Sequence, residues 1–272
     1  MQLLVLGMHR AGTSAVTRIV NLMGAYFGPE GISAGYTADN PKGFWERKDF
    51  MAFNRQILKE RGCTWFKVDG WDAASRQPLP EALRASMKAA VLELDAHRPW
   101  VLKDPRLCIT LPEWLPLLEV PAAIIVSRDP LEIARSLQMR GDVPLAHGIA
   151  LWEYYAVHTL RAAAGMPRVF VRHDRLMSDP VAAAGELYRD LVEIETLGLR
   201  APTRREILAF IDPALQRSKP GPGAAGLTPV QQRLNAMLRG EEAFDPAVEV
   251  SPPSRAFMQA LDASLGFSRQ AG

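Results

Sequence analysis

The sequence predicts an α/β fold in which a central parallel β-sheet is flanked by helices. Short apolar runs, such as residues 3–6 and 122–126, are as long as strands and lack polar alternation, which is typical of strands buried on both faces. Stretches with helical spacing separate these runs, and polar residues follow each run. Strands that alternate with helices form parallel sheets through right-handed crossovers, so we expect the strand ends to meet at one edge.

Four strands and the helices between them follow from this pattern. We expect strands at residues 3–6, 100–103, 122–126 and 168–172. We expect helices at residues 15–23, 111–118 and 145–164, with two further helices opening at Pro130 and Pro180. Asp129 suits the N-cap position, and Glu132 completes a pattern that resembles a capping box. Residues 230–238 and 254–265 predict a helical C-terminal extension, after a Gly/Pro-rich segment at 218–229 that predicts a mobile loop.

Composition limits the classes of function. With 272 residues, of which 48% are hydrophobic and 23% charged, the chain is expected to form a single domain over residues 1–272. A net charge of +2 is too small for a dedicated nucleic-acid binder but suits a small anionic ligand. Cys63 and Cys108 provide no disulfide framework and no metal-site spacing, so we expect a reducing compartment and no metal. The sequence shows no signal peptide and no apolar run long enough to span a membrane, which predicts a cytoplasmic protein.

The loop after the first expected strand has the glycine spacing of an anion-binding loop. Residues 7–14 read Gly-Met-His-Arg-Ala-Gly-Thr-Ser. Glycines allow the backbone to curl so that N–H groups and the N-terminus of the next helix face one anion. The spacing is that of a Walker A loop, but Thr13 stands where the lysine is expected, and Arg10 can supply the positive charge instead. An ordinary turn between a strand and a helix is the alternative.

The loop resembles the 5′-phosphosulfate-binding loop of the sulfotransferases, especially bacterial members and those that act on carbohydrates or protein tyrosines. In that family a Lys or Arg lies two residues before the Gly-Thr pair, and Arg10 takes this place. The resemblance implies the P-loop NTPase-like sulfotransferase fold and the donor 3′-phosphoadenosine-5′-phosphosulfate (PAPS), with adenosine 3′,5′-bisphosphate (PAP) as product. It implies that the donor is bound by His9, Arg10, Ala11, Gly12, Thr13 and Ser14.

A second motif follows the third expected strand. Arg128 stands just beyond the end of this strand, and Ser136 lies seven residues after the expected cap Asp129. Because seven residues are close to two helical turns, the serine hydroxyl returns to the face that carries the strand end. The pair resembles the family's site for the 3′-phosphate of the donor, where an arginine can bind the phosphate with two parallel hydrogen bonds.

A third motif is Lys103 in the segment Trp-Val-Leu-Lys-Asp-Pro-Arg. It resembles the Lys-Asp-Pro segment of tyrosylprotein-type sulfotransferases, in which the lysine lies near the transferring sulfuryl group. We expect Asp104 and Arg106 to support it, and a plain ion pair of Lys103 with Asp104 or Asp174 is the alternative. A shorter match resembles the stretch with which the family closes over the donor, namely Arg217, Ser218 and Lys219.

Transfer to a hydroxyl requires a general base for the acceptor proton and cations for the charge on the departing phosphate. Arg10 and Lys103 meet the second need. Residues 40–49 resemble a stretch of bacterial sulfotransferases in which an acidic residue follows Gly-aromatic-aromatic, so Glu46 is the expected base. The alternative for Glu46 is a surface ion pair with Arg47 or Lys48. Since other family members use histidine, His9 and His147 remain open.

The sequence does not identify the acceptor. We expect a hydroxyl of a carbohydrate or glycolipid, with a peptide tyrosine or a small phenol or alcohol as the alternative. Six aromatic residues are candidates for an acceptor cleft or for the core, namely Trp45, Trp65, Trp71, Trp152, Tyr154 and Tyr155.

Two other functions compete with a sulfotransferase. A P-loop kinase or nucleotidase with a degenerate Walker A loop would be expected to keep the lysine after Gly12 and to place an aspartate directly at a strand end. Here Lys103 and Arg128 end the strands, and the aspartates are displaced by one residue. A nucleotide-binding module without catalysis is the other alternative, and the joint presence of the three motifs argues against it.

Overall fold

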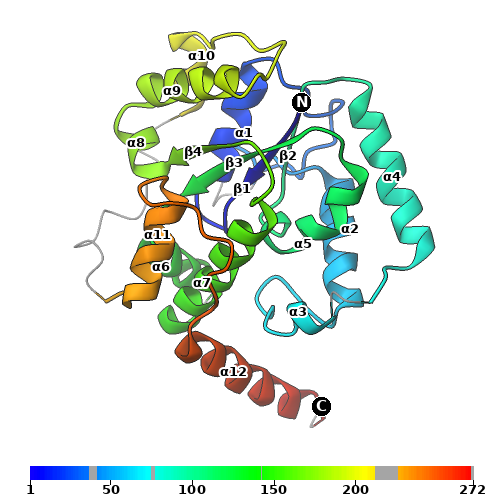
Figure 1. Cartoon of the computed structure of the whole chain (residues 1–272), viewed down its shortest axis with the longest axis vertical. Coiled ribbons are helices and arrows are strands. Elements are labelled where there is room, and N and C mark those ends of the chain that lie inside the picture. The colour runs from blue at the N-terminus through cyan, green and yellow to red at the C-terminus, as the bar shows by residue number, and fades with distance from the viewer. Residues whose placement is uncertain (37–41, 75–76, 142, 212–225, 271–272) are drawn as a thin grey trace.

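The four expected strands form one parallel sheet in the order β2-β1-β3-β4 (Figure 1). This computed structural model describes residues 1–36, 42–74, 77–141, 143–211 and 226–270. The strands are β1 (Gln2–Leu6), β2 (Trp100–Lys103), β3 (Pro121–Ser127) and β4 (Arg168–Arg172). The register pairs Leu4 with both Leu102 and Ala123, so β1 is an inner strand. The predicted α/β fold with a parallel sheet is therefore confirmed.

Helices connect the strands and continue beyond them. In the first half they are α1 (Thr13–Leu22), α2 (Lys48–Glu60), α3 (Trp71–Ala74), α4 (Glu81–Asp95), α5 (Leu107–Trp114), the short 3-10 helix η1 (Leu115–Leu117) and α6 (Pro130–Gly141). In the second half they are α7 (Leu145–Ala162), α8 (His173–Ser178), α9 (Pro180–Glu193), α10 (Arg204–Phe210), α11 (Pro229–Leu238) and α12 (Pro252–Gln270).

The helix expected at 111–118 begins earlier, at Leu107, and its α-helical part ends at Trp114. The carboxylate of Asp104 accepts a hydrogen bond from the backbone N–H of Arg106 at 2.9 Å, and the Asp104 carbonyl accepts one from Leu107. A helical turn therefore starts directly after β2, which a search for apolar spacing does not detect.

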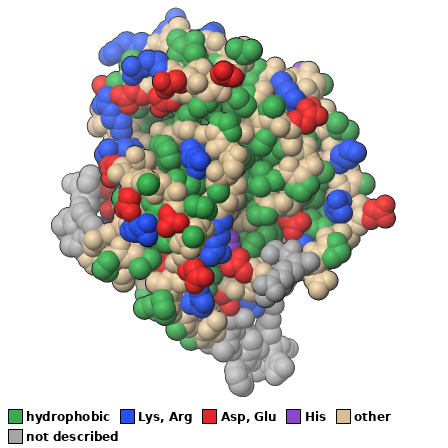
Figure 2. All heavy atoms as spheres, viewed as in Figure 1, with side chains coloured by type: hydrophobic (Ala, Val, Ile, Leu, Met, Phe, Trp, Pro, Cys, Tyr) green, Lys and Arg blue, Asp and Glu red, His purple; other side chains and the backbone are tan. Residues whose placement is uncertain are grey.

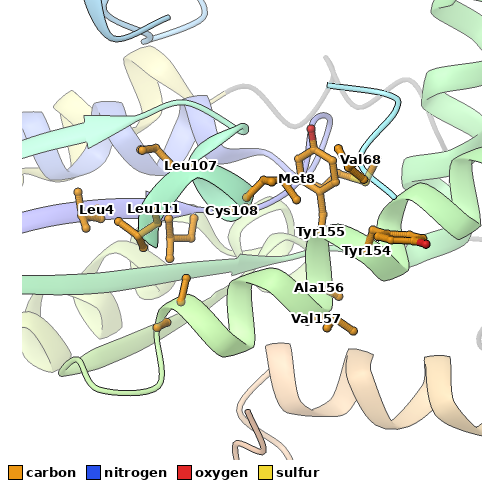
Figure 3. Close-up of a cluster of buried hydrophobic side chains, with 14 of the residues drawn as sticks. Leu4, Met8, Val68, Leu107, Cys108, Leu111, Tyr154, Tyr155, Ala156 and Val157 are labelled. Carbon is orange, nitrogen blue, oxygen red and sulfur yellow. The ribbon is translucent and has the colours of Figure 1, made fainter. Parts of the chain in front are cut away.

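Helices cover both faces of the sheet, with α1, α9 and α10 on one face and α2, α4, α5 and α7 on the other (Figure 1). Alternation along β1 explains the two layers, because Leu3 and Val5 are buried in the first core and Leu4 and Leu6 in the second. Figure 3 shows part of the second core, where Leu4 lies near Leu107 and Leu111. Continuous apolar strands are therefore buried on both faces, as predicted.

The C-terminal extension packs on α7. Glu153 of α7 is fully buried and accepts hydrogen bonds from Gln231 Nε2 at 2.8 Å, Ser251 N at 2.5 Å and Ser254 Oγ at 2.7 Å. A buried carboxylate is tolerated when its oxygens are satisfied in this way. The three donors come from α11, from the residue before α12 and from α12 itself, so one side chain fastens the extension, and the predicted helices are confirmed.

The start of α6 agrees with the predicted N-cap but not with a capping box. The Glu132 N–H donates to Asp129 Oδ1 at 2.9 Å, which is the N-cap bond. The Glu132 carboxylate pairs with Arg128 Nε at 3.0 Å. In a capping box, the Glu132 carboxylate would accept a hydrogen bond from the backbone N–H of the cap residue. Here it binds the side chain of the residue before the cap instead.

On the surface, positive and negative side chains are interspersed over the face that Figure 2 shows, in agreement with a net charge of only +2. Of the helices in the described ranges, none combines the length and apolar character required to cross a membrane.

Candidate active site

A cavity of about 680 Å³ lies at the carboxyl end of the sheet. Its wall contains Gly12 to Ser14 from the loop after β1, Lys103 at the end of β2, Arg128 after β3 and His173 after β4. All four strand ends therefore contribute to one cavity, in the position where open α/β sheets bind ligands.

The loop at residues 7–14 is held by close packing around two glycines. Gly12 has φ 91° and forms the N-cap of α1. A Cβ atom at Gly12 would lie 2.4 Å from His173 Cδ2, and one at Gly7 would lie 2.8 Å from the Val126 carbonyl oxygen. Neither position has room for a side chain, and Gly12 in addition needs a left-handed backbone. The close packing brings the N-terminus of α1 to the cavity wall, where backbone N–H groups attract anions.

We expect Gly12→Ala to destabilise the protein more than Gly31→Ala. Gly31 also has a left-handed backbone, with φ 81°, but nothing lies within 4 Å of the position of its Cβ. The control therefore measures backbone strain alone, about 1–2 kcal/mol, whereas Gly12→Ala adds the collision with His173, on the order of 1–3 kcal/mol. Urea unfolding of the two variants measures the difference. Equal losses would show that His173 moves aside without cost.

The loop and the second motif are joined by hydrogen bonds. Arg10 Nε donates to Ser136 Oγ at 2.9 Å, and an Arg128 terminal nitrogen donates to the Arg10 carbonyl at 2.8 Å. Arg10, Ser136 and Arg128 all line the cavity. Arg10 thus forms one cluster with Arg128 and Ser136, which lie more than a hundred residues further along the chain.

Lys103 connects the loop to Glu46. It is 1% exposed, and its ammonium donates to Glu46 Oε1 at 2.6 Å, to the Phe44 carbonyl at 2.5 Å and to Ser14 Oγ at 3.2 Å. Burial lowers the pKa of Lys103, and the charge of Glu46 opposes this shift. The predicted base and the predicted lysine therefore form a buried ion pair in the cavity wall.

The alternatives proposed for Lys103 were wrong. Asp104 pairs with Arg106 at 2.6 Å, and Asp174 pairs with Arg172 at 2.9 Å. The Asp104 carboxylate also accepts hydrogen bonds from the Arg106 backbone and from Asn54 Nδ2, and the Lys103 ammonium pairs with Glu46 instead. The expectation that Asp104 and Arg106 support the site agrees with this arrangement, since Asp104 holds the Arg106 guanidinium, which lines the cavity.

The surface pairs considered for Glu46 are also absent from the described residues. Arg47 pairs with Asp49 at 2.6 Å, and Lys48 donates to the Gly31 carbonyl. Both side chains therefore have other partners, and the Glu46 carboxylate meets Lys103 instead.

Of the two histidines considered as the base, one lines the cavity and the other does not. His9 lines the cavity, and its buried Nε2 has no hydrogen-bond partner in the described part of the chain. Burial, followed by the charges of Arg106 and Lys103, holds the pKa of His9 well below 6.5, so the ring is neutral at pH 7. His147 does not line this cavity and lies 3.2 Å from the Phe66 carbonyl oxygen, so it is removed from the candidates for the base.

His173 is a cavity residue that was not among the predicted donor-binding residues. Burial and the nearby Arg128 lower its pKa to about 3, so it faces the loop as a neutral ring. Its position after the fourth expected strand was the available signal.

Of the six aromatic candidates for the acceptor cleft, Trp65 is the one that lines the cavity. Trp71, Trp152, Tyr154 and Tyr155 are core residues, each at most 5% exposed. In Figure 3, Tyr155 lies beside Met8 and Val68, and its hydroxyl donates to the Trp65 carbonyl at 2.7 Å. Trp45 packs instead against Phe27 and Phe210.

Positive charge dominates the cavity wall. Its described cationic side chains are Arg10, Lys42, Arg55, Lys103, Arg106, Arg128 and Arg140. The carboxylate among the described lining residues is Glu46, which is paired with Lys103. Arg55 and Arg140 were not predicted from the sequence. The remaining predicted donor contacts, Arg217, Ser218 and Lys219, lie outside the described residues, as does most of the expected loop at 218–229.

Comparison with known proteins finds solved structures with a similar fold but no match at the level of sequence. No known family profile matches the chain, and no curated protein matches its sequence. Among solved structures, the chain is similar to the sulfotransferase domain from the curacin biosynthetic pathway, with 13% identity, coverage of 96% of each chain and a TM-score of 0.44. It is also similar to the sulfotransferase domain from the Synechococcus PCC 7002 olefin synthase, with 14% identity, coverage of 96% of this chain and 94% of that domain, and a TM-score of 0.47.

Proposed function

We propose that the chain transfers a sulfuryl group from PAPS to the hydroxyl of an acceptor. The observation that carries this proposal is that two anion-binding stations meet in one cavity. One is the loop at residues 7–14 with Lys103, and the other is Arg128 with Ser136; Arg10 hydrogen-bonds to both members of the second station. PAPS carries a phosphosulfate at its 5′ end and a separate phosphate at its 3′ position. A ligand with two separate anionic groups fits two linked stations better than a ligand with a single row of phosphates.

The residues of the cavity fit this donor. The N-terminus of α1 and Ser14 line the wall beside Lys103, and the missing Cβ atoms of Gly7 and Gly12 let the loop lie close to β3 and α8. We assign the 5′-phosphosulfate to His9, Arg10, Gly12, Thr13 and Ser14, and the 3′-phosphate to Arg128 and Ser136. Ala11, which was also expected to bind the donor, is buried, does not line the cavity and donates its backbone N–H to the Met8 carbonyl. When bound, PAPS would supply an activated sulfuryl group next to these side chains.

Lys103 and Glu46 are the proposed catalytic residues together with Arg10. As the acceptor oxygen bonds to sulfur and the bond from sulfur to the 5′-phosphate oxygen breaks, Glu46 takes the hydroxyl proton. Lys103 and Arg10 offset the negative charge that remains on the phosphate oxygen. His9 is the weaker candidate for the base, because burial and the surrounding cations lower its pKa and so reduce its tendency to accept a proton.

For the acceptor we propose a carbohydrate or glycolipid hydroxyl, with a peptide tyrosine or a small phenol or alcohol as the alternative. Trp65 gives the cavity a flat aromatic wall that suits either class. We treat residues 1–272 as a single domain, because both cores pack on one sheet. The two free buried cysteines support a reducing, cytoplasmic location.

The arrangement of carboxylates favours this function over a P-loop kinase or nucleotidase. Asp104 is engaged by Arg106 and Asn54, and Asp129 caps α6. An enzyme that acts on magnesium-bound triphosphates uses an aspartate at a strand end and the Walker lysine. In this chain Lys103 and Arg128 hold the corresponding strand ends, and Thr13 replaces the lysine.

A calorimetric comparison tests the proposal. The protein is titrated with PAP in the presence of a chelator and, separately, with ADP and magnesium. We expect PAP to bind without metal and more tightly than ADP, because PAP engages both stations. If only ADP with magnesium binds tightly, the kinase alternative is favoured. If neither ligand binds, the assignment of the cavity is overturned. Transfer of labelled sulfate from PAPS to a panel of hydroxyl compounds then distinguishes an enzyme from a binding module.

A further inference from the structure

The proposed base Glu46 lies on a short antiparallel ribbon, formed by residues 32–35 and 44–48. The Glu46 carbonyl accepts a hydrogen bond from the Ala34 N–H at 2.8 Å. The side chain of Glu46 turns to the cavity wall, where it meets Lys103. The position of the carboxylate therefore depends on how the backbone of this ribbon is held.

The two strands of the ribbon lose their register at Trp45. The Phe44 N–H donates to the Gly35 carbonyl at 2.9 Å. Phe44 is two residues before Glu46, but Gly35 is only one residue after Ala34, so one residue is extra, as in a β-bulge. Trp45, the extra residue, has φ 52°. This left-handed conformation is unfavourable for a bulky side chain and persists where surrounding contacts enforce it.

Packing of the Trp45 ring supplies such contacts. The ring is half-buried and meets Phe27 and Phe210 edge to face, with centres 5.3 and 6.0 Å away. The Arg18 guanidinium lies 4.7 Å from its centre, and the indole N–H donates to the Lys42 carbonyl at 3.1 Å. The residues on both sides of Trp45 line the cavity, but Trp45 itself does not. The ring is thus anchored outside the cavity, against α1 and α10.

The residues on either side of Trp45 hold one ammonium group between them. The Phe44 carbonyl accepts from Lys103 Nζ at 2.5 Å, and Glu46 Oε1 accepts from the same nitrogen at 2.6 Å. The Phe44 carbonyl also accepts from Ser14 Oγ at 2.7 Å, which ties the ribbon to the loop. Because one acceptor is backbone and the other is a side chain two residues further on, the conformation of Trp45 sets their relative positions.

We propose that Trp45 is a positioning residue for sulfuryl transfer. Its anchored ring holds the bulge so that Glu46 and the Phe44 carbonyl meet the ammonium of Lys103, and it touches neither substrate. This inference rests on the proposed function, because Trp45 acts through the proposed base. It also explains why tryptophan stands where the backbone favours glycine, since glycine would supply the conformation but no anchor.

The first test measures single-turnover transfer from labelled PAPS at saturating donor. We expect Trp45→Gly to slow transfer about 10- to 100-fold, because a small misplacement of reacting groups is costly. PAP affinity should stay unchanged. In a Glu46→Gln background the same substitution should slow transfer little further, since the base that it positions is already gone. Trp45→Phe keeps an aromatic ring and should restore most of the rate. Equal slowing in both backgrounds would overturn the inference.

Phe244→Gly is the matched control. Phe244 is half-buried and does not line the cavity, and the Arg168 guanidinium lies 4.1 Å from the centre of its ring. This substitution also removes a ring beneath an arginine and adds a glycine, so it should leave transfer unchanged. If it slows transfer as much as Trp45→Gly does, the effect is general loosening of the fold and the positioning role is rejected.

Urea unfolding gives a second readout that does not need activity. Glu46→Gln deprives the buried Lys103 of its carboxylate and should lower the urea midpoint. In Trp45→Gly, where the pair is already loosened, the same change should lower the midpoint much less. If Trp45→Gly shows no cooperative transition, Trp45→Leu takes its place in both tests.

The outcomes separate the two proposals. If the protein transfers sulfate from PAPS but the two losses in urea simply add, the positioning role is wrong and the proposed function stands. If the losses are coupled but PAPS gives no transfer, Trp45 positions the ion pair and the proposed function fails. Additive losses without transfer would reject both.

Discussion

Lys103→Met is expected to lower kcat for sulfuryl transfer by about 100- to 1000-fold, the usual effect of removing one group that stabilises charge in the transition state. The affinity for PAP should fall much less, because the loop backbone, Arg10 and Arg128 remain. Single-turnover rates with labelled PAPS and calorimetry with PAP measure the two effects separately. A variant that keeps most of its turnover would remove Lys103 from the mechanism.

The buried pair with Glu46 supplies the control for this substitution. Lys103→Met leaves the Glu46 carboxylate without its partner at a site that is 9% exposed, and such a loss destabilises a protein. Adding Glu46→Gln removes the stranded charge, so the double variant should regain stability in urea unfolding and remain inactive. Glu46→Gln alone should slow turnover and leave PAP binding nearly unchanged; full activity of this single variant would mean that the base lies elsewhere.

Arg128→Ala is expected to weaken PAP binding by about 10- to 100-fold, the range for losing a hydrogen bond to a charged group. Binding of adenosine 5′-monophosphate, which lacks the 3′-phosphate, should change little. The difference between the two ligands is diagnostic, because Arg128 also holds the Arg10 carbonyl at 2.8 Å. A purely structural role would weaken both ligands together.

Arg135→Ala is the matched control for this experiment. Arg135 belongs to α6, like Ser136, but does not line the cavity. The variant removes the same charge from the same region, so it should bind PAP like the unaltered protein. A loss of affinity equal to that of Arg128→Ala would point to long-range electrostatics rather than to a phosphate contact.

The sequence contained enough information for the sheet and for the residues at its edge. Continuous apolar runs located all four strands, and the rule that strand ends meet brought Lys103 and Arg128 into one cavity with the loop. Ser136 was singled out by the resemblance to the family's 3′-phosphate site, and its helical spacing from the cap at Asp129 agreed with a position on the cavity side, where the structure has it. These successes concern local patterns whose meaning does not depend on distant partners.

The partners of the charged groups, and the cations that line the cavity from α2 and α6, could not be predicted in the same way. Glu46 and Lys103 come from segments 57 residues apart. Asp104 adjoins Lys103 in the sequence, and Asp174 follows another expected strand, so both were equally reasonable partners from the sequence alone. Arg55 lies in a helix whose apolar spacing reveals its buried face but not which neighbour covers the other faces. Its place in the cavity wall depends on the hydrogen bonds of Asn54, which only the folded chain brings together.

The inner position of β1 also bears on how the chain is made. Gln2 pairs with Trp100 on one side and with Pro121 on the other, so a chain growing from the ribosome leaves β1 unpaired until those segments have emerged. Closing such long loops is slow and leaves hydrophobic strand edges open to other chains. The central strand that organises the ligand cavity is therefore paired late, and a chaperone that covers apolar segments would protect it in the interval.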